Sequence, residues 1–144
     1  MFFKKFIWGF VIIFCVFLFG PDTLLGQMTL ISKFQKVNIP VNLLLDNVTV
    51  EAGVYDLEIL IQNETQVFFL RIIKGGKNLA VVRGERLEYK TKSMESFADP
   101  DIPEKATLKM TRNTEEKILS LQFESGKKAS FYPFLKLRFK MKYE

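Results

Sequence analysis

The sequence predicts a single small all-β domain, an antiparallel and barrel-like fold of about eight strands that follows an N-terminal signal segment. A β-sandwich is the alternative. Three observations support this prediction. Apolar and polar residues alternate with a period of two through most of residues 27–144. Turn-forming residues separate the alternating runs at the spacing of about 8–12 residues that is typical of sandwiches and barrels. A continuous apolar run precedes all of them.

The first 26 residues have the order of a secretory signal peptide. Lys4 and Lys5 form a short positive region, and residues 6–19 form the apolar run. Its length fits a signal-peptide core of about 7–15 residues better than a membrane span of ~20. We therefore expect residues 1–26 to be removed near Gly26, with an uncleaved anchor as the alternative. Residues 27–144 then form one exported domain, in the periplasm or outside the cell.

Four segments show the alternation of half-buried strands most clearly. Each has its apolar side chains on one face and its polar side chains on the other. They are VYDLEILI (54–61), KATLKMTR (105–112), ILSLQF (118–123) and LKLRFKMKY (135–143). Turns are expected at Asp46-Asn47, Asn63-Glu64, Gly75-Gly76, Asn113 and Gly126.

The predicted hairpin over residues 54–73 is apolar on both of its faces. A strand that is apolar on both faces is normally covered on both. The cover is either another part of this domain or another protein, so the side chains facing away from the core form a candidate partner surface. They are Leu60, Val67, Phe69 and Ile73.

The segment from Lys92 to Glu104 interrupts the strand pattern. Met94 and Phe97 within it are spaced like one turn of a helix. Long connections of this kind are either functional or merely mobile. We expect a connection whose two apolar side chains plug an open end of the fold, and the alternative is a lid over a ligand pocket.

Most catalytic and metal chemistry is excluded by the residues that are missing. The chain has no His, and its one Cys, Cys15, lies in the signal segment. Zinc sites and the Ser-His-Asp and Cys-His catalytic groups require these residues. The acidic residues Asp99, Asp101 and Glu104 lack the dense spacing of a calcium loop. We therefore expect no catalytic residues, no metal and no cofactor, and the protein is not expected to be an enzyme.

The segment 135–143 places four basic side chains on one face of a strand, Lys136, Arg138, Lys140 and Lys142. Spaced about 6.6–6.8 Å apart, they could follow the charges of an anionic envelope surface. Alternatively, this is an edge strand whose lysines prevent aggregation and pair with Asp56 and Glu58. The sequence favours this second explanation. Nucleic acid is not an expected partner, because the strand's aromatic side chains face the other way and cannot stack bases beside the charges.

The segment VNIPVNLLLDNVTVEAGVYDLEIL (37–60) resembles small exported bacterial β-domain proteins of unassigned function. Those proteins open with a Pro-containing strand followed by an Ala-Gly-x-Tyr turn, here Ala52, Gly53, Val54 and Tyr55. The resemblance implies an exported β-domain that ends in a basic and apolar strand. It implies no activity and no site residues.

These observations together predict a non-enzymatic protein of the cell envelope that binds another macromolecule. The partner would be an envelope protein or an anionic envelope surface, and contact with a membrane is expected only through an uncleaved N-terminal segment. The alternative is a small lipocalin-like carrier of an apolar ligand. Its cavity would lie under residues 92–104 and be lined by Tyr55, Leu57, Phe68, Leu108, Met110 and Phe139.

Overall fold

The computed structural model describes residues 27–88, 102–129 and 132–144, which form ten β-strands and no helix. The prediction of an all-β domain is confirmed. The expected signal segment lies outside the described residues. So do Met94 and Phe97 of the connection after β7. The strands are β1 (Met28–Ile39), β2 (Leu43–Leu45), β3 (Val48–Val50), β4 (Gly53–Gln62), β5 (Val67–Lys74), β6 (Lys77–Arg83), β7 (Glu85–Leu87), β8 (Thr107–Asn113), β9 (Ile118–Glu124) and β10 (Lys136–Tyr143).

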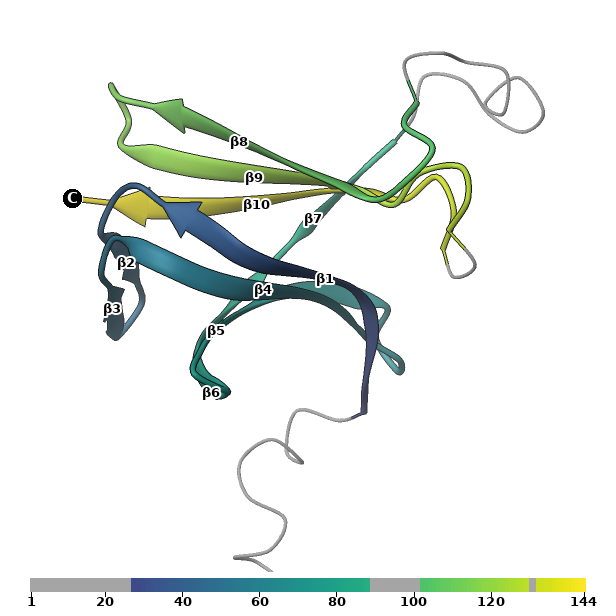
Figure 1. The fold of residues 1–144 in the computed structure, drawn as a ribbon, viewed down its shortest axis with the longest axis horizontal. Helices are drawn as coiled ribbons and strands as arrows, with labels where there is room; N and C mark the ends of the chain where they lie inside the picture. The colour runs from purple at the N-terminus through teal and green to yellow at the C-terminus, as the bar shows by residue number, and fades with distance from the viewer. Residues whose placement is uncertain (1–26, 89–101, 130–131) are drawn as a thin grey trace, which may run out of the picture.

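The strands form two antiparallel sheets that face each other (Figure 1). Sheet A has the order β1-β4-β5-β6, and sheet B has the order β3-β2-β10-β9-β8 with β7 also paired to β10. Within the described residues the two sheets do not close into one barrel, so the barrel-like prediction is wrong. The arrangement is sandwich-like. Alternation gives the same apolar inner face in both architectures, and closure depends on strand pairing, which alternation does not encode.

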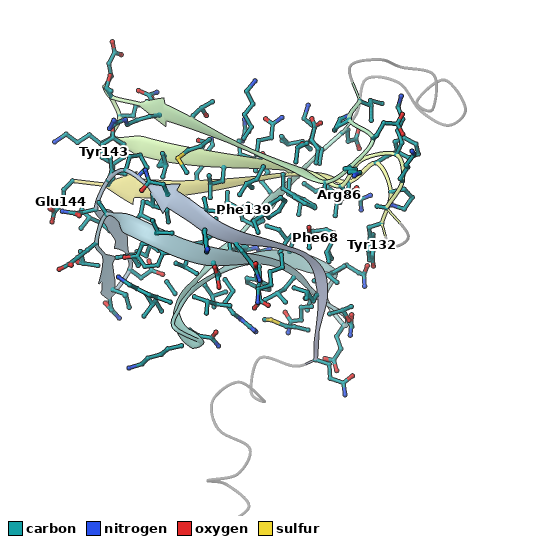
Figure 2. The ribbon with its side chains drawn as sticks, in the orientation of Figure 1. Phe68, Arg86, Tyr132, Phe139, Tyr143 and Glu144 are labelled. Carbon is teal, nitrogen blue, oxygen red and sulfur yellow. The ribbon has the colours of Figure 1, made fainter. Side chains whose placement is uncertain are left out.

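The core lies between the two sheets and is filled by their inner faces. Leu57 of sheet A and Leu121 of sheet B are both fully buried in one cluster. Phe34 of β1 meets Phe123 of β9 edge to face, with ring centroids 6.0 Å apart. The side chains expected to line a ligand cavity belong to this same core or pack against it (Figure 2 labels Phe68 and Phe139): Tyr55, Leu57, Phe68, Leu108, Met110 and Phe139.

The tight turns have the backbone conformations that their residues favour. Gly75 and Gly76 join β5 to β6 with φ of 58° and 76°, which glycine adopts without a steric cost. Asp46 has φ of 43° in the two-residue turn between β2 and β3. Both turns are where the sequence predicts them. The turn at Asp46 joins β2 to β3, and β2 pairs with β10.

Gly84 is the point at which the chain crosses from sheet A to sheet B. It follows β6 and precedes β7, and its N–H donates to the Phe68 carbonyl at 2.8 Å. A Cβ atom at this position would lie 2.5 Å from Cε1 of Phe139. The Phe139 ring is fully buried and has little room to move. Only glycine therefore fits this crossing without displacing the core.

We expect Gly84→Ala to lower the free energy of unfolding by about 1–3 kcal/mol, the usual cost of overpacking a core. Urea unfolding would measure this cost. The matched control is Gly53→Ala, where the nearest atom, in Tyr55, is 3.6 Å from the new Cβ. In a Phe139→Leu background the cost of Gly84→Ala should shrink, because the clashing ring is gone. Equal costs at the two glycines would contradict the close approach.

Candidate functional site

The last strand, β10, lies inside sheet B and not at its edge. On one side β9 pairs with it from Lys136 to Lys142. On the other side β7 pairs with Lys136–Arg138 and β2 with Lys142–Tyr143. The explanation of its lysines as protection of an open edge is therefore wrong. An alternating sequence shows which face is buried, but an edge strand and a central strand of a half-exposed sheet share that pattern.

The first half of the basic row is neutralised by acidic residues of the same sheet. Lys136 Nζ lies 3.7 Å from Glu124 Oε1 on β9, and Arg138 Nη2 lies 3.1 Å from Glu85 Oε2 on β7. Each pair sits directly across two neighbouring strands. These partly exposed pairs contribute little to stability, but they offset the charge of this end of the row.

Asp56 and Glu58, the partners expected from the sequence, lie in the other sheet. Both belong to β4, where Glu58 pairs with Arg71 at 3.4 Å and Asp56 accepts the backbone N–H of Lys36 at 3.1 Å. That expected pairing is wrong. The acidic residues that do pair come from β7 and β9, whose adjacency to β10 the sequence does not reveal.

The second half of the row, Lys140 and Lys142, carries exposed positive charge with no ion pair among the described residues. Ser120 lies opposite Lys140 on β9. Leu44 lies opposite Lys142 on β2. The cross-strand neighbours are thus neutral, and the row is split into a paired half and an uncompensated half.

A cleft of about 470 Å³ opens beside this uncompensated half. On this side of β10, β7 pairs with its first part and β2 with its last part. The middle of β10 has no strand partner there, and the cleft lies beside it. The β2–β3 hairpin forms one wall and the end of β6 forms the other. The apolar part of its lining consists of Leu44, Leu45, Val81, Val82 and Met141.

The charged part of the cleft lining has an excess of positive charge. Arg83, Lys140 and Lys142 supply three cations, and Asp46 supplies one carboxylate. All four side chains belong to exposed residues. We call Arg83, Lys140 and Lys142 the cationic group. It can attract an anion to one point of the surface, whereas the net charge of +5 over the whole chain is mild.

Two large apolar side chains of the cleft are also exposed. Leu44 is 42% exposed on the hairpin wall and Val81 is 44% exposed on the β6 wall. Val82 and Met141 below them are buried. The cleft therefore offers apolar surface and positive charge side by side, a combination suited to a ligand that has both an apolar and an anionic part.

The candidate partner surface lies on the outer face of sheet A, away from sheet B. Leu60 and Phe69 are directly opposite each other on β4 and β5, and Val67 and Ile73 share their face. Leu60 and Ile73 are buried without belonging to the central core cluster. The half-buried Glu58–Arg71 pair crosses the same face and interrupts its apolar character. The structure thus places the four residues together as alternation predicts.

Sequence reasoning found Lys140 and Lys142 but missed the other contributors to the cleft. Arg83 and Val81 come from β6 in sheet A, and Leu44 comes from a strand of three residues. These residues could have been found only from knowledge that β2 and β7 pair with β10. Nothing in the local pattern of those segments carries that information.

The described part of the chain contains no cluster of three or more His, Cys, Asp or Glu that could hold a metal ion. No helix in residues 27–88, 102–129 and 132–144 is long and apolar enough to cross a membrane. No family model, no curated protein and no solved structure matches the chain. The resemblance of residues 37–60 to exported β-domains stays a prediction.

Proposed function

We propose that this protein is a non-enzymatic, exported binding domain that attaches to an anionic component of the cell envelope through the cleft beside β10. The observation that carries the proposal is the uncompensated charge of Lys140 and Lys142, joined by Arg83. Export rests on the order of the first 26 residues. The lack of a catalytic role rests on the absence of His and of Cys from residues 27–144.

The arrangement of the cationic group supports binding better than it supports a purely solubilising role. Alternate residues on one face of a strand are about 6.6–6.8 Å apart, so Lys140 and Lys142 lie within the screening length of ~8 Å at physiological salt. Their charges act on the same ligand. Lysines that merely protect an edge belong on an unpaired strand, whereas β10 pairs with β9 along its length and with β7 and β2 at its two ends.

Reversal of two charges tests this proposal. We expect Lys140→Glu/Lys142→Glu to weaken binding to vesicles containing anionic lipid by at least about thirtyfold, because each lysine near an anionic surface contributes about 1 kcal/mol. Co-sedimentation with vesicles at low salt measures the affinity. Wild-type binding should also fall steeply as salt is raised.

The control variant carries the same change in net charge at a distance from the cleft. Lys77→Glu/Lys109→Glu alters two exposed lysines that do not line it. This variant should retain most of the wild-type affinity. Equal losses in both variants would mean that bulk charge alone attracts the protein. Wild-type protein that does not sediment with anionic vesicles at low salt would end the proposal.

A further inference from the structure

The geometry points to a more specific ligand for the cleft, a single anionic amphiphile whose headgroup meets the cationic group and whose alkyl chain lies against the apolar walls. This inference rests on the proposed function, since it uses the same cations. It adds a bound molecule of defined chemistry where the proposed function requires only a charged surface.

The apolar lining of the cleft comes from both sheets. Leu44 of sheet B and Val81 of sheet A are each more than two-fifths exposed, at 42% and 44%, and line the same cleft. Val82 and Met141 are buried beneath them. Leu44 also sits directly opposite Lys142. An alkyl chain between these walls would remove apolar surface from water while its charged end stayed beside the lysines.

The charges favour one compact anionic headgroup over a long polyanion. Arg83 has a planar guanidinium that matches carboxylate and phosphate oxygens in pairs, and Lys140 and Lys142 add two point charges. Asp46 lies on the lining of the same cleft. An extended polyanion running through the cleft would bring negative charge against Asp46, whereas a single headgroup can stay at the cationic group.

The backbone beside the cleft disfavours an added peptide strand. The N–H of Glu144 donates to the backbone carbonyl of Asn42, on the β2 side. The N–H of Tyr143 donates to the backbone carbonyl of Lys117, on the β9 side. Because this direction alternates along a strand, Lys140 directs its N–H and C=O towards the β2 side. Between the pairings with β7 and β2, Lys140 is the one residue of β10 whose backbone groups face this side without a partner strand. A single residue gives too few hydrogen bonds to hold a strand.

The size of the cleft fits a small molecule. Its volume of about 470 Å³ falls within the range of about 300–1,000 Å³ common to ligand sites. The amphiphile could be a lipid within a bilayer or a free molecule in solution. Both carry the same chemistry, and the experiment below distinguishes the two sources.

The test uses isothermal titration of the full chain with dodecyl phosphate below its micelle concentration. We expect one molecule to bind per chain. Inorganic phosphate, which has the charge without the alkyl chain, should bind at least about a hundredfold more weakly, because each buried CH₂ contributes about 0.8 kcal/mol. Dodecyltrimethylammonium, which has the chain with the opposite charge, should not bind.

Two pairs of substitutions assign the apolar contact. Leu44→Ser/Val81→Ser should weaken dodecyl phosphate binding by at least about tenfold, since it removes both exposed walls. The matched control is Val48→Ser/Val54→Ser, which changes two valines that are 43% and 52% exposed and do not line the cleft. The control should bind like the wild type. Lys140→Glu/Lys142→Glu should abolish binding.

The outcomes separate this inference from the proposed function. Suppose that anionic vesicles bind and lose binding on charge reversal, while dodecyl phosphate binds no better than inorganic phosphate. The amphiphile site is then wrong and the proposed function stands. Binding of dodecyl phosphate without binding of vesicles supports the site with a free amphiphile as its ligand, and the surface-binding function fails. If neither binds, both are wrong.

Discussion

Replacing Phe139 by Ala is expected to lower the free energy of unfolding by about 3–5 kcal/mol, the usual cost of truncating a large core side chain. Phe139 is fully buried, lies on the strand with most partners in sheet B, and fills the space next to Gly84. Small domains are stable by about 5–15 kcal/mol, so this loss is a large share of the total. Urea unfolding followed by circular dichroism would show a much earlier midpoint.

The control for Phe139→Ala is Lys140→Ala, the next residue on the same strand with its side chain on the exposed face. Surface substitutions of this kind usually change stability by no more than about 0.5 kcal/mol. If both variants unfolded at the same urea concentration, the position of Phe139 in the shared core would be wrong.

Replacing Gly126 by Ala is expected to cost about 2–5 kcal/mol, from two sources that act together. Gly126 has φ of 86°, a left-handed conformation that costs other residues about 1–2 kcal/mol. A Cβ atom there would also lie 2.8 Å from the carbonyl oxygen of Glu104 and from the carbonyl group of Lys105, and such overpacking adds about 1–3 kcal/mol. Backbone atoms cannot rotate away as a side chain can. Thermal or urea unfolding would measure the loss.

Gly76→Ala separates the two sources at Gly126. Gly76 also has positive φ, 76°, but a Cβ atom there would meet nothing within 4 Å. This variant should therefore show the backbone strain alone and be less destabilised than Gly126→Ala. Equal losses would show that the segment 125–128 does not lie close to residues 103–105, in conflict with the hydrogen bonds from Lys127 to Pro103 and from Lys128 to Glu104.

The sequence was sufficient to predict an all-β fold and the inner faces of its most regular strands, but it predicted about eight strands where the described residues form ten. The alternation in 54–61, 118–123 and 135–143 places Leu57, Leu121 and Phe139 in the core, where the structure has them. The two-residue pattern reports only which face a side chain occupies. It carries no signal for the neighbour of a strand, and therefore the barrel and the edge position of β10 were predicted wrongly.

The candidate site could be predicted only in part, for the same reason. Lys140 and Lys142 stand out locally because they alternate along one strand. Arg83 and Leu44 reach them through the pairing of β2 with β10 and through the crossing at Gly84. These residues are 57 to 98 positions apart in the chain. Long-range pairing of this kind is decided by the packing of the whole domain.

The central position of β10 governs the order in which the domain can assemble during synthesis. The strands of sheet A are all made by residue 83, and they can pair early. Three strands of sheet B, β2, β7 and β9, pair with β10, which is translated after all of them. Until residues 136–143 emerge, the nascent chain exposes the apolar inner face of sheet A, a state prone to aggregation. Docking of β10 is therefore the step that joins β2, β7 and β9 into one sheet and covers the inner face of sheet A.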